Sequence, residues 1–541
     1  MKINAIKRLT AVMLSAVFIN LSFTACTSDN KAGNTTATET NESEAISKQD
    51  DFYTAVNKKW ISSAQYSEDI GYINYTTTCQ DNINSFFSDY ITQLHYSDLN
   101  EDEKKLLILY EQYTDGQLEA SVEIAREYVQ SISKAEALKD IETLYADPKL
   151  SLYNGLFNFE LTSTKAGYAL ELSAMSITGI NMAESPYILD DNGITKYTNH
   201  INDLLMKSKI FDKVTAFDIA EKAVALEVDV AQCFAENRST YNKSMHNPKS
   251  DFIFNMDFPN LLTALGYNSD YQYVTCLDAY TDLLNDELLT EDNVENLKAY
   301  LTACVVCRIV GMTDNTSQNG IPFYGIANYY MRDVMVSAYL NSNITDEDID
   351  NVTEMVDEII AVYKAKINNI SYLSDDTKGK ALRKLDNINA VIAIPGSLMS
   401  YANADVSSTY SYVTNCENCL LNKRSEQNKF LSSKYSIEKI VFDTMEVNAH
   451  YYPGSNSILI HAGILQEPVY SREKSFEENL GGIGTIVAHE ISHSLDIAGS
   501  EYDENGDYKS WWSIEDRKAY IDRAMTGTND LRPDFKKMIQ D

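Results

Sequence analysis

Apolar residues at helical spacing dominate the sequence between residues 97 and 373. One stripe with a spacing of three or four positions consists of Leu118, Val122, Ala125, Val129 and Ile132. A second stripe consists of Ile349, Val352, Val356, Ile359, Ile360 and Tyr363. Thr345 precedes the second stripe as a suitable N-cap, and Pro and Gly are rare in the region, as helices require. We therefore predict a mostly helical region whose stripes face an ordinary core.

The hydrophobic pattern changes near residue 390. The apolar run Ala390–Ile394 is short and ends at Pro395-Gly396, which predicts a buried strand. Further on, Val447–Tyr452 and Ser457–His461 flank the turn-forming residues Pro453–Asn456, which predicts a β-hairpin. The predicted fold class is mainly α with a small β element, that is α+β.

The N-terminus has the pattern of a lipoprotein signal peptide. Three basic residues precede the apolar run Leu9–Phe23, and the small residues Thr24-Ala25 follow it. Cys26 then completes a sequence that resembles a bacterial lipobox, so we expect a diacylglyceryl anchor on this residue. Ordinary secretion with an incidental Cys is the alternative. The run is too short to favour a spanning helix. Residues 1–25 therefore predict a protein of the bacterial cell envelope, outside the cytoplasm and anchored to the membrane by lipid.

Composition predicts a flexible tether after the signal peptide and an acidic protein surface. Residues 26–48 are rich in Ser, Thr, Asn and Glu, which is typical of a flexible linker. The 541-residue chain has 45 Lys and Arg against 79 Asp and Glu, a net charge of −34. Such an acidic surface argues against nucleic acid and anionic membrane surfaces as binding partners.

The segment Asn479–Gly499 carries the clearest chemistry in the chain. His489 and His493 are four positions apart, so a helix would place both imidazoles on one face, where they can bind a single Zn²⁺. Glu490 can act as general base toward a metal-bound water. Asp496 lies three residues after His493, close enough to accept the free N–H of that imidazole.

The residues that flank this motif favour a zinc site over a chance occurrence of the HExxH pattern. A bare HExxH also occurs as an ordinary polar helix face. Here, however, Gly481, Gly482 and Gly484 provide a flexible entry, and Gly499 can stop the helix. The helix between them is apolar, with Ile486, Val487, Ile491 and Leu495. Polar His and Glu side chains in so apolar a segment need a partner, which favours zinc.

Four motifs carry a family resemblance. In chain order they are Val447-Asn448-Ala449, Ala462–Gln466, Asn479–Asp496 and Trp511-Trp512. Together they resemble the neprilysin and endothelin-converting-enzyme family of zinc metallopeptidases. Asp50–Trp60 and Thr377–Pro395 are similar to that family's opening and to a later segment. The resemblance implies a large helical domain followed by a thermolysin-like zincin catalytic domain.

The same resemblance suggests domain boundaries and a substrate strand. We expect a mostly helical N-terminal peptidase domain over residues 49–396, a connecting segment over 397–445 and the start of the catalytic domain over 446–541. In the family, the first hairpin strand is an edge along which the peptide substrate lies. Its Asn–Ala pair corresponds to Asn448 and Ala449, whose side-chain amide and backbone carbonyl would hold the substrate backbone.

The third zinc ligand is missing from the expected pattern. In the resembling family it is a Glu in an ExxxD motif on a later helix. The chain stops at Asp541, and none of the three Glu residues after the motif is in an ExxxD match. We therefore expect one zinc ion bound by His489 and His493, with the third protein ligand absent from a C-terminally truncated chain.

Two functions follow as alternatives. The first is a surface-anchored zinc-dependent endopeptidase that hydrolyses peptides or small proteins at the amino side of apolar residues, as the resemblance implies. The second is a non-catalytic peptide-binding surface lipoprotein or an inactive remnant. An ExxxD-like segment encoded after codon 541 would favour the enzyme.

Other metal-binding residue types receive structural interpretations. Cys304 and Cys307 are predicted to be packed core, and Cys416 and Cys419 to be exposed and able to form a local disulfide, although the two pairs together could mimic a four-thiolate zinc site. His450 stands where the family usually has Phe or Tyr, which leaves the subsite preference open. We interpret His450 and His461 as surface residues of the hairpin. Residues 503–507 are interpreted as a hairpin tip rather than a calcium loop.

Overall fold

The computed structural model describes residues 54, 58, 74–96, 98–115, 118–164, 167–237, 243–247, 253, 255–267, 274–313, 323–393, 398–431 and 444–531. The predicted signal peptide, Cys26, the tether and all of the motif at Asp50–Trp60 except Thr54 and Lys58 lie outside the described residues. Two compact units are distinguished, one formed by Met1–Thr78 with Met525–Asp541 and the other by Cys79–Ala524. The second unit contains two hydrophobic cores and the candidate site.

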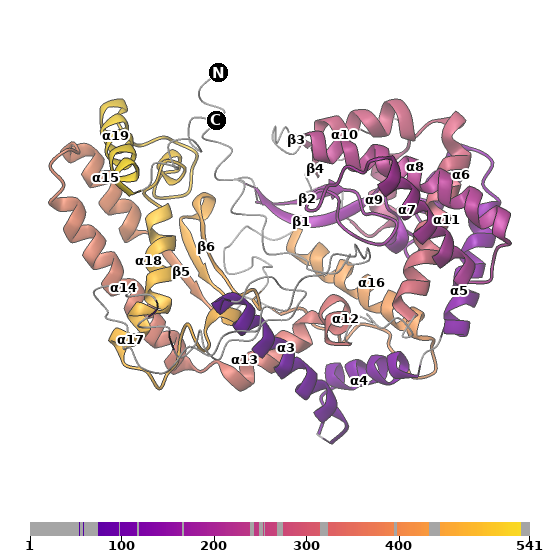
Figure 1. Ribbon diagram of the computed structural model, residues 1–541, viewed down its shortest axis with the longest axis horizontal. Coiled ribbons are helices and arrows are strands. Elements are labelled where there is room, and N and C mark those ends of the chain that lie inside the picture. The colour runs from indigo at the N-terminus through magenta and orange to yellow at the C-terminus, as the bar shows by residue number, and fades with distance from the viewer. Residues whose placement is uncertain are drawn as a thin grey trace, which may run out of the picture. The chain divides into compact units, whose positions relative to one another are not determined.

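Helices account for most of the described residues, which confirms the predicted fold class (Figure 1). They are α3 (Tyr75–Gln93), α4 (Glu101–Thr114), α5 (Leu118–Ser133), α6 (Leu138–Tyr145), α7 (Asp191–Lys207), α8 (Lys213–Asn237), α9 (Phe258–Ala264), α10 (Asp278–Leu283), α11 (Val294–Thr313), α12 (Phe323–Tyr330), α13 (Arg332–Asn343), α14 (Asp346–Asn368), α15 (Asp375–Asp386), α16 (Tyr412–Leu431), α17 (Phe476–Gly481), α18 (Ile483–His493) and α19 (Ile514–Leu531). Among the described residues, no helix is long and apolar enough to cross a membrane.

The first core lies around α11, whose residues are buried on nearly all sides by α5, α7 and α8. A four-stranded sheet packs with these helices, in a region where the sequence predicted mostly helix. Its strands are β1 (Asn158–Thr164), β2 (Gly167–Ser173), β3 (Lys243–His246) and β4 (Val274–Leu277), in the order β1-β2-β4-β3. β1 and β2 form an antiparallel hairpin, and β2 pairs with β4 in parallel. The prediction of a mostly helical region is confirmed, but it did not identify these four strands.

The second core combines residues from distant parts of the chain, from Cys79 to Trp511. Its sheet has the order β5-β7-β6 and contains β5 (Asn389–Ile392), β6 (Ala449–Tyr452) and β7 (Ser457–Ile460). β7 is buried along its whole length because it is the central strand, with β5 parallel on one side and β6 antiparallel on the other. The predicted strand and the predicted hairpin are therefore both present, and β6 is an edge strand of this sheet.

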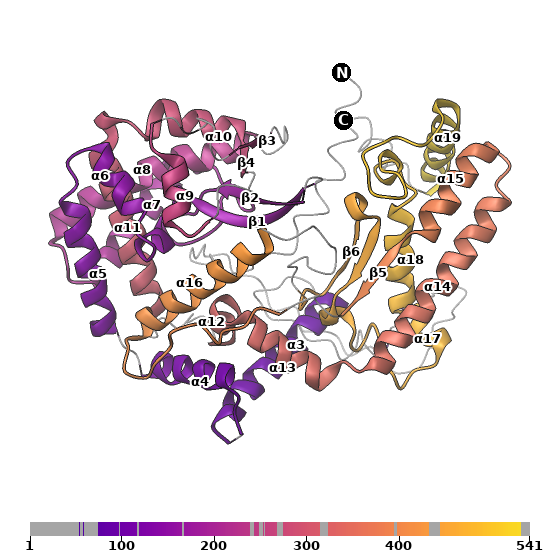
Figure 2. The ribbon, with the colours of Figure 1, turned by 180° about the vertical axis from the view of Figure 1, so that it is seen from behind.

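Helix α14 supports the second core from outside the sheet. It begins as predicted at Thr345, whose side chain accepts a hydrogen bond from the backbone of Asp348 while the Asp348 carboxylate accepts one from Thr345. This reciprocal cap satisfies two N-terminal donors of the helix. In Figures 1 and 2, α18 lies between β6 and α14. The Tyr363 hydroxyl of α14 donates to the carbonyl of Ala488 at 3.0 Å, which fixes α18 against its neighbour.

The cysteines of the two CxxC pairs are free thiols buried in helices. Cys304 and Cys307 lie inside α11, as predicted. Cys416 and Cys419 are also buried, so the prediction that they are exposed is wrong. The physical reason is that a spacing of three residues places both thiols on one face of α16, and this face packs against other helices of the molecule.

Candidate active site

Gly482 and Gly499, on either side of α18, are required by close backbone contacts. A Cβ on Gly482 would lie 2.1 Å from the carbonyl oxygen of Val469, and the next residue, Ile483, donates its backbone N–H to that oxygen at 3.0 Å. A Cβ on Gly499 would lie 1.9 Å from the carbonyl oxygen of His493. The helix ends at His493, so the prediction that Gly499 stops it is wrong; Gly499 instead lets the following turn fold back onto the helix end.

His489 and His493 converge at the C-terminal end of α18. Their Nε2 atoms are 3.1 Å apart, with the two rings nearly perpendicular at 84°. The Nδ1 atom of His493 is 2.8 Å from Oδ2 of Asp496, and the other carboxylate oxygen of Asp496 accepts the backbone N–H of Gly499 at 2.8 Å. Asp496 is therefore held at both oxygens and fixes the ring of His493 with Nε2 facing His489.

Glu490 lies beside this pair but is buried, with 7% of its surface exposed. Burial raises the pKa of its carboxyl group, opposed by the charges of His493 and His450 and by a backbone hydrogen bond from Tyr451. Tyr451 belongs to β6, so the carboxylate is placed between the motif helix and the edge strand. Partial desolvation of its ring and the charge of His493 lower the pKa of His489, which favours the neutral imidazole with its lone pair available.

The donor set fits zinc. Two neutral imidazole nitrogens are common zinc ligands, and ligands of one tetrahedral ion at about 2.0–2.2 Å lie roughly 3.3–3.6 Å apart. The 3.1 Å separation of the two Nε2 atoms is close to this value. Among the described residues, the ligand atoms that gather at this point come from His489, Glu490 and His493, all within 4.8 Å of one another. His489 is exposed, so an ion can reach the site from solvent.

A buried lysine connects the motif to the rest of the second core. The side chain of Lys384, from α15, is almost fully buried, and its Nζ donates to the carbonyls of Gly499 and Tyr502 at 2.5 Å each. The same nitrogen lies 5.8 Å from the ring centroids of Tyr451 and Trp511. Burial lowers the pKa of Lys384 to about 8, against the raising effect of nearby carboxylates. Lys384 thus contacts the edge strand, the turn after α18 and the Trp-Trp motif together.

Sequence reasoning did not single out Lys384 as a site residue, although it lies within Thr377–Pro395, one of the segments that carried the family resemblance. Through Lys384, this segment contacts both Trp511 and the turn that follows the zinc motif. Lys384 is one of four basic residues in α15, and such a set is typical of a helix face exposed to solvent. The sequence therefore did not distinguish this buried Lys from the others.

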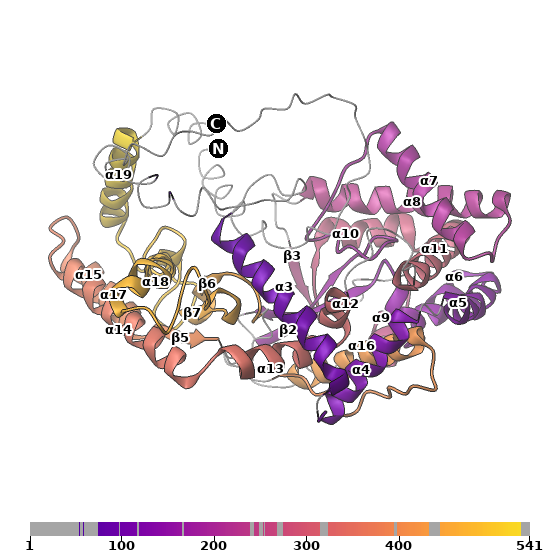
Figure 3. The ribbon, with the colours of Figure 1, turned by 60° about the horizontal axis from the view of Figure 1, so that its bottom comes forward.

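Asn448 and Ala449 lie at the start of the edge strand, and Figure 3 shows β6 and β7 beside α17 and α18. The amide nitrogen of Asn448 donates to Oε1 of Glu446 at 3.1 Å and lies 3.3 Å from Nε2 of His450. The backbone carbonyl of Asn448 accepts the backbone N–H of His461 at 3.3 Å. Ala449 is buried, so its side chain anchors the strand in the core.

The interpretation of His461 as a surface residue of the hairpin is wrong. It follows the fully buried strand β7 and is 1% exposed, because the chain turns inward into the buried residues Ala462–Ile464. His450 is half-buried on β6. The turn at residues 503–507 agrees with the predicted hairpin tip: Asp503 accepts the backbone N–H of Gly506, and Tyr502 pairs with Tyr508.

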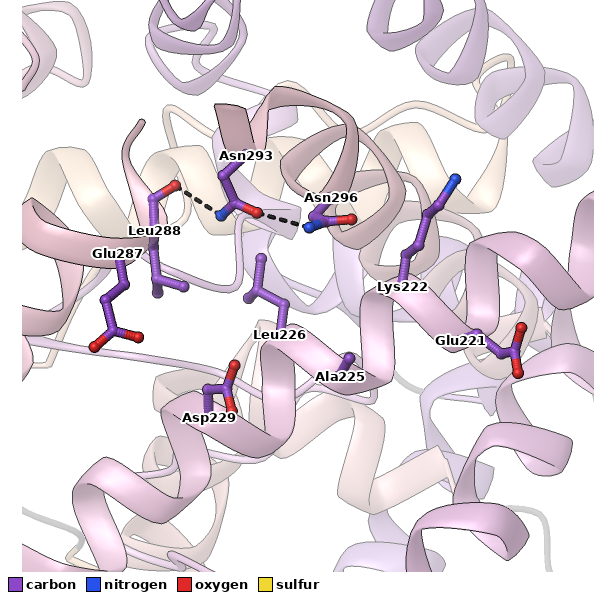
Figure 4. A pocket seen from close by; sticks show the side chains of 9 residues that line it. All are labelled: Glu221, Lys222, Ala225, Leu226, Asp229, Glu287, Leu288, Asn293 and Asn296. Carbon is purple, nitrogen blue, oxygen red and sulfur yellow. Dashed lines mark hydrogen bonds between the residues drawn. The ribbon is translucent and has the colours of Figure 1, made fainter. Parts of the chain in front are cut away.

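An open hollow of about 360 Å³ on the helical part of the molecule does not involve these residues (Figure 4). It lies between α8 and the start of α11, and its lining includes Asp229, Glu287, Asn293 and Asn296. Asn296 donates to the side chain of Asn293, which itself donates to the carbonyl of Leu288. Asn293, Asn296 and the carbonyl of Leu288 are therefore hydrogen-bonded to one another.

Known proteins resemble this chain over most of its length. Residues 48–395 and 448–531 match two sequence models that are both described as Peptidase family M13. A Streptococcus gordonii protein named as a zinc metalloproteinase of the scaA 5'region is 26% identical over 523 residues, which covers 88% of this chain and 90% of that protein. Mouse neprilysin is 28% identical over 209 residues, covering 37% of this chain and 28% of neprilysin.

Other matches show how much of the relatives' length and fold the chain shares. It spans about half the length of the Lactococcus lactis neutral endopeptidases, 54% of the subsp. cremoris protein at 28% identity over 58% of this chain. The solved structure of PepO from Lactobacillus rhamnosis HN001 has a TM-score of 0.72 at 22% identity, covering 88% of this chain and 80% of that one. This structural likeness shows a common fold.

Proposed function

This chain belongs to peptidase family M13, whose members among its relatives include zinc metallopeptidases, and from this premise we propose that it hydrolyses peptide bonds as a zinc-dependent endopeptidase. The single observation that carries the proposal is the convergence of His489 and His493 beside the buried carboxylate of Glu490. This arrangement provides a metal site and a base within a few ångströms of each other.

Each residue of the site has a separate task. His489 and His493 would hold a zinc ion through Nε2, and Asp496 keeps the ring of His493 in position. Bound zinc supplies Lewis-acid polarisation and a lower pKa for its water. Glu490 takes a proton from the attacking water at its carboxylate and can pass it to the leaving amine. Because burial raises its pKa, this carboxylate is a stronger base than an exposed one.

Peptide substrates fit the edge strand beside this site. Within the described residues β6 pairs only with β7, so its other edge offers backbone groups to an extended peptide. The backbone of Tyr451 on this strand reaches Glu490, which places the strand next to the base. We propose that Asn448 and Ala449 hold the substrate backbone, with Asn448 oriented by its contacts to Glu446 and His450.

Removal and return of metal tests the proposal. We expect a form of the protein that contains the third zinc ligand expected from the family to cleave a quenched fluorescent peptide, to lose this activity after dialysis against 1,10-phenanthroline, and to regain it with added Zn²⁺, because a hydrolytic zinc site needs three protein ligands and the ion. Mass spectrometry of the products should show internal cleavage at the amino side of apolar residues. A protein that binds the peptide in a fluorescence-anisotropy assay but never cleaves it, with zinc bound, would instead support the peptide-binding alternative.

We also propose that the protein is anchored to the cell envelope by lipid on Cys26, which rests on the signal-peptide and lipobox pattern of the sequence. A diacylglyceryl group supplies two acyl chains, enough for stable anchoring. In a bacterial host, Cys26→Ser should move the protein from the membrane fraction to the soluble fraction, whereas Cys233→Ser should leave it with the membrane. Unchanged partitioning of Cys26→Ser would rule the anchor out.

A further inference from the structure

We propose that Glu446, His450 and His461 form a second binding site for a divalent transition-metal ion, separate from the pair on α18. The three side chains come from the segment before β6, from β6 and from the end of β7. One ligand atom from each lies within 4.8 Å of the other two. Two imidazoles and a carboxylate are a set of ligands that Zn²⁺, Co²⁺ and related ions prefer.

The distances are those of a site that needs little rearrangement. Nε2 of His450 is 3.2 Å from Oε2 of Glu446, and Nε2 of His461 is 3.9 Å from the same oxygen. Ligands of one tetrahedral ion lie roughly 3.3–3.6 Å apart. The two imidazole rings are nearly perpendicular, with centroids 5.2 Å apart. The two distances to Oε2 of Glu446 are thus within a few tenths of an ångström of ligand separations, and the two imidazole nitrogens lie within 4.8 Å of each other.

Charge favours a cation at this point. Burial raises the pKa of Glu446, but hydrogen bonds from His450 and Asn448 and the charges of the two imidazoles outweigh it and lower the pKa below its ordinary value. The carboxyl group is therefore ionised near neutral pH while its side chain is only 11% exposed. A buried carboxylate beside two imidazoles gains from a cation that satisfies all three groups at once.

The surroundings hold the ligands in place and leave an entrance. Asn448 donates to Oε1 of Glu446, so the other oxygen, Oε2, faces the two imidazoles. Such an outer hydrogen bond is the usual way in which a ligating carboxylate is oriented. His461 is 1% exposed, whereas the side chain of His450 is 22% exposed and provides the route by which an ion enters from solvent.

The contrasting interpretation is that the three residues form a hydrogen-bonded network that only stabilises the hairpin. Both interpretations predict a folded protein, but they differ in metal stoichiometry. A network binds no ion of its own, whereas the proposed site adds one ion to whatever the pair on α18 binds. The proposal does not depend on peptidase activity, so its test uses metal binding alone.

The experiment measures Co²⁺ binding to the metal-free full chain by equilibrium dialysis with elemental analysis. The background variant His489→Ala/His493→Ala removes the site on α18 and should still bind one Co²⁺ per chain, with an absorption spectrum of low-symmetry cobalt. Adding His450→Phe or Glu446→Gln to this background should weaken that binding by more than about 100-fold, because loss of even an outer partner costs 10–100-fold. Adding His95→Gln, from a single His–Glu pair elsewhere, should leave it unchanged.

Two results would overturn the proposal. One is a folded background variant, judged by circular dichroism and thermal melting, that binds no Co²⁺. The other is Co²⁺ binding that survives both His450→Phe and Glu446→Gln. If the background variant does not fold, the same single substitutions in the otherwise unchanged protein decide the question, since each should lower the stoichiometry by one ion if the site exists and leave it constant if it does not.

Discussion

In a form of the protein that contains the expected third zinc ligand, Glu490→Gln should lower kcat/KM for a peptide substrate by roughly 10²–10⁴-fold, which is the usual cost of removing a general base. The substitution keeps the shape of the side chain and removes its ability to accept a proton. Zinc content should remain close to that of the unchanged protein, because the two imidazoles that hold the ion are four positions apart on their own face of α18. Cleavage of a quenched fluorescent peptide and zinc per chain are measured on the same preparation.

The comparison variant for this experiment is Glu477→Gln, in the first turn of α17. It makes the same chemical change on an exposed side chain and should leave both activity and zinc unaltered. The role assigned to Glu490 is wrong if Glu490→Gln keeps more than about a tenth of the activity, since a base that contributes at least 10²-fold cannot be dispensable.

His493→Ala and His489→Ala should each remove zinc and activity together, because the loss of one imidazole leaves an incomplete set of ligands. Asp496→Asn should give a graded effect, with zinc affinity lowered by about 10–100-fold, since Asp496 orients His493 without touching the ion. The hydrogen bond to Asp496 raises the pKa of His493. Protons therefore compete with metal at higher pH than for a free imidazole, and zinc affinity should fall as the pH is lowered through that raised pKa.

Zinc affinity from competition with a fluorescent chelator, measured over a pH series, tests this prediction. His95→Ala serves as the control, because it removes an imidazole that is not part of the motif. Affinity at the site on α18 must be read in a variant with Glu446→Gln, so that the second proposed site does not contribute. Full zinc affinity in His493→Ala would contradict the assignment of this residue as a ligand.

Local patterns were sufficient to predict the parts of the fold that are set by near neighbours in the sequence. The cap at Thr345, the helical stripe before Tyr363 and the hairpin around Asn456 all depend on residues a few positions apart. Asn456 has a left-handed backbone, with φ of 47°, which an Asn accepts more readily than most residues. The spacing of His489 and His493 likewise placed both rings on one helix face before any tertiary contact was considered.

Tertiary contacts explain what the sequence did not reveal. The alternation in Gly167–Ser173 is visible in the sequence, but the parallel partner of that strand, β4, lies about a hundred residues away, and no local signal announces it. Cys416 and Cys419 are buried because other helices cover one face of α16. His461 is buried because it follows the central strand of a sheet. In each case burial is decided by elements distant in the chain.

The contacts of Lys384 join parts of the molecule that are far apart in the sequence. Lys384 donates hydrogen bonds to carbonyls 115 and 118 positions further along the chain. The strand after α15, β5, pairs with β7. Closing loops of this length costs entropy that is recovered only when the distant partners meet. The helix with the two His residues and the bond from Gly499 to Asp496 can form locally, whereas the bonds of Lys384 to Gly499 and Tyr502 need α15 in place. We therefore expect metal affinity during refolding to reach its full value only after these long-range contacts have formed.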